Sequence, residues 1–260
     1  MSEFDWIETY FAPLADRAGA SGLRDDVARL SHSNRVITCD ALVENVHFLP
    51  TDPIESIAQK LVRVNVSDIF SKGCQPDDAL LTLGWPASRC EADLALFATA
   101  LGAELKAFKA GLIGGDTVSA PSLFLSLSLT GRPLSARAPI LRSGAQIGDF
   151  ICVTGVIGAG ALGLKAARGE PVMRAAEALS HYRTPNIPSL DIAHFIARSA
   201  HASMDISDGL LADAEKLAKA SQCTASIALD RVPFFEPTQT LKSALEQATG
   251  GDDYQCLITL

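Results

Sequence analysis

Hydrophobic and polar residues alternate strictly over residues 123–131, LFLSLSLTG. The leucines of this segment share one face, while Phe124 and the serines occupy the other, which predicts a half-buried strand. Residues 35–48, RVITCDALVENVHF, predict another strand, a polar break and a second extended piece. Both segments have a face too apolar for solvent, so we expect these faces to contact a second copy of the chain.

Helical periodicity occurs in two further segments. A helix is predicted from Asp52 or Pro53 to Gly73, because apolar residues recur there at helical spacing and both ends carry suitable start and stop residues. Residues 91–110 predict a second helix. Residues 111–117, GLIGGDT, predict a short strand that ends in a turn.

Proline, glycine and serine are frequent over residues 132–149, which indicates a domain boundary near residue 145. A new strand is predicted over residues 149–157, and helices and strands then alternate to the last residue. We therefore expect a mixed fold, α/β or α+β, with an N-terminal domain over residues 1–142 and a C-terminal domain over residues 148–260.

The composition excludes several classes of function. The 260 residues carry 30 acidic and 22 basic side chains, so the net charge of −8 and the pI near 5.1 argue against a nucleic-acid partner. Apolar runs are shorter than the ~20 residues that span a membrane, and the acidic N-terminus is unlike a signal peptide. The six cysteines are scattered, so we expect neither zinc nor disulfides and predict a reducing, cytoplasmic location.

A glycine pattern follows one of the predicted strands. Gly158, Gly160 and Gly163 spell G-x-G-x-x-G, which is typical of dinucleotide sites. Such a site also needs a second strand that ends in Asp or Glu about 20 residues later. The segment that follows here is helical and then turns at a proline, so we predict that these small residues let a helix pack closely.

Asp68 lies on the core-facing stripe of the first predicted helix, in line with Ile57, Leu61 and Val64. A carboxylate in that position is costly unless something pairs with it. Either the stripe meets solvent at this end of the helix, since Gly73 is close, or this end faces a cation. The residue pattern leaves both interpretations open.

Two aspartates stand three residues apart in SMDISDGLL, where an apolar segment meets a predicted helix. A helix cap at Ser207 or Asp208 would explain this arrangement, because negative charge stabilises a helix start. A binding role for Asp205 and Asp208 is the alternative, and the other aspartates of the chain favour it.

Those other aspartates stand where α/β sheets bind ligands. Asp40 ends VITCD, Asp116 follows two glycines in LIGGD, and Asp26 stands in LRDDVA. Carboxylates that converge would repel one another without a metal ion, and oxygen-only ligands suit Mg²⁺, which is often shared with a phosphate. We therefore predict that one cleft is lined by Asp40, Asp68, Asp116 and Asp205.

An ordered set of motifs resembles the thiamine-monophosphate kinase family: LRDDVA, ITCDALVENVHF, VNVSDIFSKGCQP, LIGGDT, LRSGAQIGD, VTG, MDISDGL and GGDDYQ. The resemblance extends over nearly the whole chain, from about residue 4 to residue 260. The wider superfamily also contains aminoimidazole ribonucleotide synthetases, selenophosphate synthetases and a hydrogenase maturation factor.

The resemblance implies transfer of the γ-phosphoryl group of ATP to thiamine monophosphate. It also implies a homodimer whose N-terminal strands form a β-barrel between subunits, an ATP site completed across that dimer, and a C-terminal sheet packed with helices. No protein nucleophile or base is expected, because the attacking phosphate oxygen is already anionic. By motif match, several Mg²⁺ ions would be held by Asp26, Thr38, Asp40, Asp68, Asp116, Asp205 and Asp208. ATP would be contacted by Gly115, Asp116, Arg142 and Ser207, and thiamine monophosphate by His47 and Asp252.

Both substrate assignments have structural alternatives. His47 also suits a loop histidine that packs beside Phe48. GGDDYQ also suits a β-turn with solvated acids, although we expect its glycines to place Asp252 against the substrate and Asp253 to support the loop.

The chain departs from the family pattern at several places. Leu23 and Arg24 replace glycines before the first aspartate pair, and Cys39 replaces a threonine, so that only its carbonyl would suit Mg²⁺. Asp252 replaces a glutamate and has one methylene less reach. The family normally continues beyond the position of Leu260 with more strand and helix, so we expect a shortened chain that lacks one wall of the substrate site.

Two other functions stay open from the sequence. One is another ATP-dependent enzyme of the superfamily, but a selenophosphate synthetase would carry a reactive cysteine before Asp25, and a hydrogenase maturation factor would end in cysteine instead of Leu260. The other is a catalytically inactive protein that binds magnesium or nucleotide, which the irregular LRDD segment and the position of the last residue favour.

Overall fold

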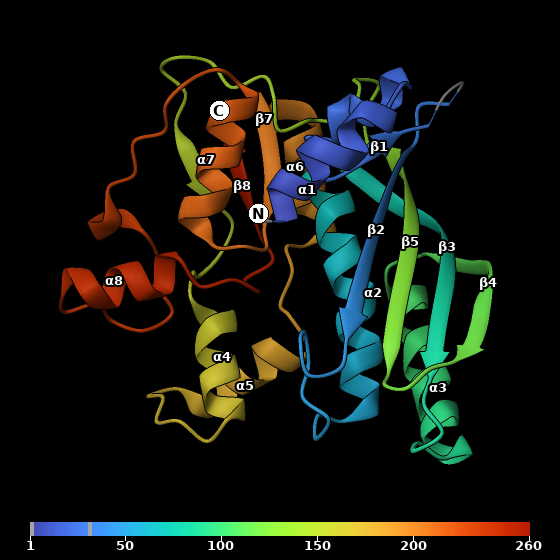
Figure 1. The fold of residues 1–260 in the computed structure, drawn as a ribbon. Helices are drawn as coiled ribbons and strands as arrows, with labels where there is room; N and C mark the ends of the chain where they lie inside the picture. The colour runs from blue at the N-terminus through green and yellow to red at the C-terminus, as the bar shows by residue number, and fades with distance from the viewer. Residues whose placement is uncertain (1–2, 31–32) are drawn as a thin grey trace.

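The computed structural model describes residues 3–30 and 33–260, which form two separate β-sheets with helices around them (Figure 1). The larger sheet has the order β1-β2-β5-β3-β4 and consists of β1 (Ala28–Arg29), β2 (Val36–Val43), β3 (Cys74–Trp85), β4 (Gly111–Ser119) and β5 (Phe124–Pro133). The smaller sheet has the order β6-β8-β7 and consists of β6 (Ile151–Val153), β7 (Ala202–Ile206) and β8 (Gln255–Thr259). The mixed α/β class predicted from the sequence is confirmed.

The helices divide in the same way between the two halves of the chain. The first half contains α1 (Glu3–Trp6), the short helices η1 (Ile7–Phe11), η2 (Ala12–Leu14) and η3 (Ala18–Leu23), and the long helices α2 (Ile54–Ser71) and α3 (Glu91–Ala107). The second half contains α4 (Ala159–Ala167), α5 (Ala175–Arg183), α6 (Leu190–Ser199), α7 (Leu210–Ala220), η4 (Leu229–Arg231) and α8 (Leu241–Ala248). Helix α2 lies between the larger sheet and the C-terminal half, and contacts both sheets (Figure 1).

The core of the first half lies between the larger sheet and α2. Leu125, Leu127 and Leu129 of β5 are fully buried and pack with Ile57 and Leu61 of α2 in one apolar cluster. The apolar face of the alternating strand is therefore covered by a helix of the same chain. Our expectation that this face contacts a second copy was wrong, because alternation shows that a face is buried but does not show which element buries it.

Cross-strand pairing defines an inner face of the larger sheet, toward α2, and an outer face on the other side. Asp40 pairs with Leu127, so both side chains are on the inner face. Asp116 pairs with Thr82, which pairs with Ser126, so these three are on the outer face. The register thus separates two aspartates that we had expected in one cleft.

Strand boundaries differ from the sequence predictions in three places. Strand β3 was not predicted, although it is central and pairs with both β4 and β5. Strands β2 and β4 continue through Asp40 and Asp116, so these residues lie within strands instead of at strand ends. Gly115 is required for this pairing, because a Cβ atom there would lie 1.9 Å from the carbonyl oxygen of Leu81 on β3.

The G-x-G-x-x-G segment forms the start of α4 and serves close packing, as predicted. A Cβ atom on Gly160 would lie 2.4 Å from the carbonyl oxygen of Asp252, and one on Gly163 would lie 2.2 Å from the carbonyl oxygen of Ala178. Among the described helices, none combines the length and the apolar character needed to cross a membrane.

Candidate active site

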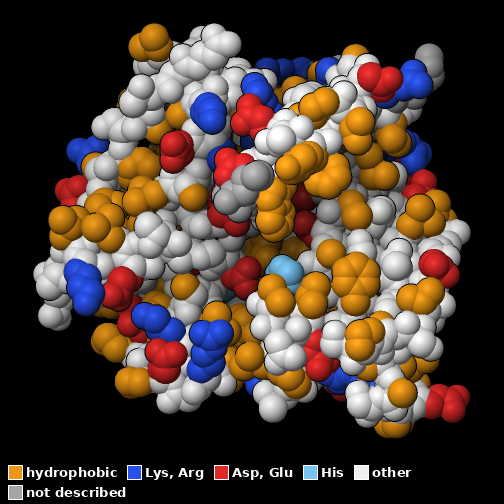
Figure 2. Space-filling view, viewed as in Figure 1, with side chains coloured by type: hydrophobic (Ala, Val, Ile, Leu, Met, Phe, Trp, Pro, Cys, Tyr) orange, Lys and Arg blue, Asp and Glu red, His pale blue; other side chains and the backbone are white. Residues whose placement is uncertain are grey.

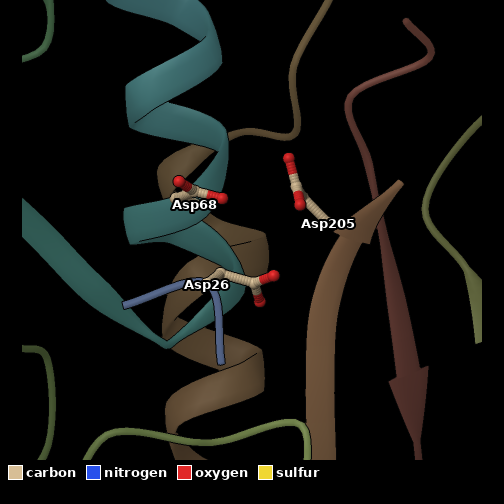
Figure 3. Close-up of side chains that lie close together, drawn as sticks. All are labelled: Asp26, Asp68 and Asp205. Atoms are coloured by element: carbon tan, nitrogen blue, oxygen red, sulfur yellow. The ribbon is translucent and has the colours of Figure 1, made fainter. Parts of the chain in front are cut away.

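Three aspartates from distant parts of the chain converge beside α2. Asp26 comes from the loop before β1, Asp68 from α2 and Asp205 from β7, and one carboxylate oxygen of each lies within 4.8 Å of the others. Figure 3 shows the three side chains directed toward a common space between α2 and β7. We call Asp26, Asp68 and Asp205 the acidic cluster. Seen from the side drawn in Figure 2, the molecule is hollowed between its two halves, and acidic side chains are visible in the hollow.

The carboxylates of the cluster are buried and held in place by hydroxyl groups. Asp68 is 8% exposed and accepts a hydrogen bond from Thr38 Oγ1, whereas Asp205 is 3% exposed and accepts one from Ser67 Oγ at 3.0 Å. Asp68 therefore does not lie where its helix meets solvent. The structure favours the other interpretation of this residue, in which the end of the stripe faces a cation.

Burial and mutual repulsion shift the pKa values of these acids upward. Burial raises the pKa of Asp68 and of Asp205 well above the ordinary value, and neighbouring negative charges raise both further. Asp40 lies beside the cluster on β2, and burial together with the charge of Asp26 raises its pKa to about 6. These groups are costly to ionise together, and a cation among them would remove that cost.

Asp26 differs because it already has cationic partners. Lys72 is fully buried and forms ion pairs with Asp25, at 3.0 Å, and with Asp26. Arg142 Nε donates to Asp26 Oδ1 at 2.7 Å. Burial would raise the pKa of Asp26, but the charges of Lys72 and Arg142 outweigh it and hold this pKa below the ordinary value. Sequence reasoning missed Lys72, since a lysine at a helix end is normally explained by the helix dipole.

The donor set of the cluster suits a hard divalent cation such as Mg²⁺. All three side chains offer carboxylate oxygens, and they come together inside the fold. Among the described contacts, Asp68 and Asp205 form no ion pair with a lysine or arginine. Thr38 is also close, because its hydroxyl lies within hydrogen-bond distance of both Asp68, its shorter contact, and the carbonyl oxygen of Asp26.

Two predicted metal ligands lie elsewhere in the single chain. Asp116 is exposed on the outer face of the larger sheet, on a strand that is separated from β2 by β5 and β3, about 14 Å across the sheet. Asp208 forms an ion pair with Lys216 and has a side chain that is more than half exposed. The expectation that Asp116 lines the same cleft as Asp68 is therefore wrong for one copy of the chain, and its role as a ligand, like that of Asp208, stays a prediction.

The helix after DISDG is not capped by the residues proposed for that role. Its N-cap is Gly209, which makes no side-chain cap bond. Asp213, which is fully buried, instead reaches back and accepts the backbone N–H groups of Ser207 and Asp208, both at 3.0 Å. The capping alternative for Ser207 and Asp208 is therefore wrong, and the sequence pattern had not singled out Asp213.

The two predicted substrate residues meet at a lysine that sequence reasoning missed. Lys60 Nζ on α2 donates to the carbonyl oxygen of His47 at 3.0 Å and to Asp252 Oδ2 at 2.7 Å. The ring of His47 accepts a hydrogen bond from the backbone N–H of Val43 through Nδ1 at 3.0 Å. His47 therefore has a structural role within its own loop, as the alternative interpretation proposed.

The acids of GGDDY are not those of a solvated turn. Asp253 is fully buried and accepts the backbone N–H groups of Gly158 at 2.8 Å and Gly160 at 3.1 Å, so it supports the loop as expected. Tyr254 donates its hydroxyl to Asp252 Oδ1 at 3.0 Å. The two aspartates thus anchor the loop at the start of α4 and at Lys60.

Two family models match most of the chain. The N-terminal domain of AIR synthase related proteins matches residues 24–132, and the C-terminal domain of the same proteins matches residues 146–258. Fold and site therefore place the chain in the class of AIR synthase related proteins.

Similar proteins narrow this class. The thiamine-monophosphate kinase of Caulobacter vibrioides is 36% identical to this chain over 98% of the chain and 75% of that protein. The crystal structure of thiamine monophosphate kinase from Aquifex aeolicus superposes with a TM-score of 0.86 at 27% identity, covering 99% of this chain and 87% of that one. The complex of AaThiL with AMPPCP and TMP superposes with a TM-score of 0.87 at 28% identity, covering 99% and 84%. The chain belongs to the thiamine-monophosphate kinase family.

Proposed function

We propose that this protein transfers the γ-phosphoryl group of ATP to thiamine monophosphate and so produces thiamine diphosphate. The observation that carries the proposal is the acidic cluster. Its three buried carboxylates have more negative charge than the neighbouring lysine and arginine offset, which suits the metal ions that accompany a nucleoside triphosphate. Family membership supports the choice of acceptor, and a solved relative is a complex with AMPPCP and TMP.

We propose that Mg²⁺ is held by Asp26, Asp68 and Asp205, with Asp40 and Thr38 beside them. The ion would supply neutralisation of the negative charge on the phosphates. The guanidinium group of Arg142 pairs with Asp26 next to the cluster, where it is available to the phosphates of ATP. Lys72 holds Asp25 and Asp26 in place through its ion pairs with both.

The reaction requires alignment of two anions more than proton transfer. An oxygen of the acceptor phosphate forms a bond to the γ-phosphorus of ATP, the bond to the bridging oxygen breaks, and ADP leaves with the electron pair. The attacking oxygen is already ionised, so the chain's contribution is to hold donor and acceptor in line and to exclude water. We place the acceptor near Asp252 and the His47 loop, and the nucleotide near Arg142 and Ser207.

We further propose a homodimer formed through the outer face of the larger sheet. This face and the adjacent edge strand expose apolar side chains, among them Leu80, Ile113 and Val118. A second copy seated there would cover them and would give Gly115 and Asp116 a place next to a nucleotide, in the intersubunit barrel that the family resemblance implies. Sedimentation at micromolar concentration tests this, and a monomer would contradict it.

Two coarser proposals complete this picture. We propose that the chain divides into domains near residue 145, which lies between the two matched family models. We propose a cytoplasmic location, which the six free cysteines support.

ADP release with and without thiamine monophosphate tests the function. We expect release that depends on both thiamine monophosphate and Mg²⁺, and that falls strongly in Asp68→Asn. ATP turnover that ignores thiamine monophosphate would point to another enzyme of the superfamily. Binding of Mg·ATP without any turnover would point to the inactive binding protein.

A further inference from the structure

Lys60 joins three segments that are far apart in the sequence. Its Nζ contacts the carbonyl oxygen of His47 in the loop after β2, Oδ2 of Asp252 in the loop before β8, and the ring of Tyr182 on α5, whose centroid is 4.5 Å away. Lys60 is only 2% exposed. In Figure 1, these segments lie on the side of α2 that faces the C-terminal half, and Lys60, in the first half of α2, contacts both halves of the chain.

The ammonium group of Lys60 is already saturated by these contacts. Two oxygens take hydrogen bonds, and the face of an aromatic ring takes the remaining side of the charge. Lys60 is therefore not a free cation that waits for the phosphate of a ligand. Its effect must come through the groups that it holds.

Asp252 is one of those groups, and its backbone is strained. Asp252 has φ +68° and Tyr254 has φ +49°, in the left-handed region that residues other than glycine seldom adopt. The N–H of Asp252 donates to the carbonyl oxygen of Ser207 at 2.9 Å, which ties this loop to the segment that follows Asp205. The carboxylate of Asp252 is 33% exposed, so part of it stays open to solvent.

The neighbouring core residues of α2, Ile57 and Leu61, are apolar. A buried ion pair is often replaced as a pair by apolar residues without loss of stability, whereas removal of Lys60 alone would leave the carboxylate of Asp252 without its cation. Burying the ammonium group costs desolvation and side-chain entropy. What an apolar side chain would not supply is a defined position for Asp252 and for the carbonyl group of His47.

We propose that Lys60 is a positioning residue of the acceptor site. It fixes Asp252 and the His47 loop relative to each other, and so determines the geometry in which thiamine monophosphate is bound. The proposal rests on the function proposed above, and it concerns the acceptor alone, because no described contact of Lys60 involves the acidic cluster.

Substitution of Lys60 by methionine tests this role, because methionine keeps the length of the stem and removes the charge. In Lys60→Met we expect the KM for thiamine monophosphate to rise about 10-fold, the fold-change that corresponds to losing one modest ion-pair contact, while the KM for ATP changes less than about 2-fold. Lys165→Met is the matched control, since Lys165 lies on α4 with a half-exposed side chain, and it should leave both constants unchanged. Equal effects on both substrates, or no effect on thiamine monophosphate, would overturn the proposal.

A double-mutant cycle with Asp252→Asn separates positioning from general weakening. If Lys60 acts through Asp252, the two substitutions together should raise the KM for thiamine monophosphate little more than either alone. Effects that multiply would show that Lys60 acts independently of Asp252 and would contradict the mechanism.

Amide hydrogen exchange provides a readout that does not depend on activity. We expect Lys60→Met to exchange faster over residues 44–49 and 250–254 and to match the wild type in β5. Unchanged exchange in both loops would overturn the positioning role even in an inactive enzyme. A wild type that shows no ADP release with thiamine monophosphate would instead refute the proposed function, whatever the exchange data show.

Discussion

Helix α2 carries two buried charges of opposite sign, and they define two different environments. Lys60 faces the carboxylate of Asp252, so an acid and a base of the same chain are paired. Asp68 lies eight residues later, about 12 Å along the helix axis, and faces the carboxylates of Asp26 and Asp205. One region is electrostatically complete, whereas the other has more negative charge than its cations offset.

The difference explains what each region is suited for. A complete pair fixes geometry, because moving either partner would leave a buried charge alone. An incomplete cluster binds, because an added cation removes repulsion that folding alone cannot remove. Asp26 lies between these cases, since Lys72 and Arg142 balance it while its neighbours Asp68 and Asp205 remain in excess.

The largest expected effect comes from removing one charge of the acidic cluster. Asp68→Asn should lower the rate of ADP release by at least about 100-fold and weaken Mg·ATP binding, because the amide is a poorer ligand for a hard cation. Without metal the same variant should unfold a few degrees higher than the wild type, since repulsion is relieved. Titration calorimetry measures the affinity for Mg·ATP, and scanning calorimetry measures the unfolding temperature. A variant that binds Mg·ATP as the wild type does would remove Asp68 from the site.

The paired region is also sensitive to packing. Gly160→Ala should destabilise the protein by about 1–3 kcal/mol, because the new Cβ would press on the carbonyl oxygen of Asp252. Gly102→Ala on α3 is the control, since a Cβ there meets nothing within 4 Å, and it should stabilise by up to about 1 kcal/mol. Denaturant unfolding measures both. Equal stability of the two variants would show that α4 has room to move away from the loop.

The pH dependence of stability should separate the regions further. Asp40 has its pKa raised to about 6, and Asp68 and Asp205 have theirs raised well above the ordinary value of 3.8. Between the ordinary and the raised pKa, the folded state binds protons that the unfolded state has released, so stability falls as the pH rises. Without metal we expect stability to fall by on the order of 1–2 kcal/mol between about pH 4 and about pH 6 from Asp40, and Asp68 and Asp205 should extend the fall to higher pH.

Two controls identify the source of that fall. Excess Mg²⁺ should reverse it, because the ion binds the ionised carboxylates of the folded state. Asp68→Asn should show a shallower slope, since one titrating group is gone, while the opposing contribution of His181, whose burial lowers its pKa, is common to both proteins. Thermal unfolding as a function of pH measures these slopes, and parallel curves for the two proteins would exclude Asp68 as a source.

The smallest expected effect concerns the hydroxyl that holds Asp68. Thr38→Val keeps the shape of the side chain but removes the hydrogen bond to Asp68, at a cost of about 1 kcal/mol, so Mg²⁺ affinity should fall about 5-fold. Thr99→Val on α3 removes a comparable hydroxyl far from the cluster and should leave the affinity unchanged. A loss as large as that of Asp68→Asn would mean that Thr38 is itself a ligand.

Local pattern predicted the elements that a periodicity can encode. The alternation of β5 and the apolar stripe of α2 were readable, because each depends on spacing within a few residues. The packing role of the α4 glycines was readable because the second strand that a dinucleotide site needs does not follow them. The family motifs also pointed to Asp26, Asp68 and Asp205, among seven residues expected to hold metal ions. Strand β3 was missed, since its mostly apolar segment ALLTLGW has no regular alternation to distinguish it.

The tertiary structure alone decided which of these residues meet. Lys60 and Asp252 are 192 residues apart, and Ser67 and Asp205 are 138 apart, so no local pattern links them. For Asp116, local pattern could not predict which face of the sheet its side chain occupies. The strand register places it on the outer face, and a shift of one residue would have placed it on the inner face. The sequence by itself determined which faces of the helices and strands are apolar, through short-range periodicity, and which residues carry charge. Packing determined which charges are paired and which are left for a ligand, because that depends on contacts between segments that are neighbours only in the folded chain.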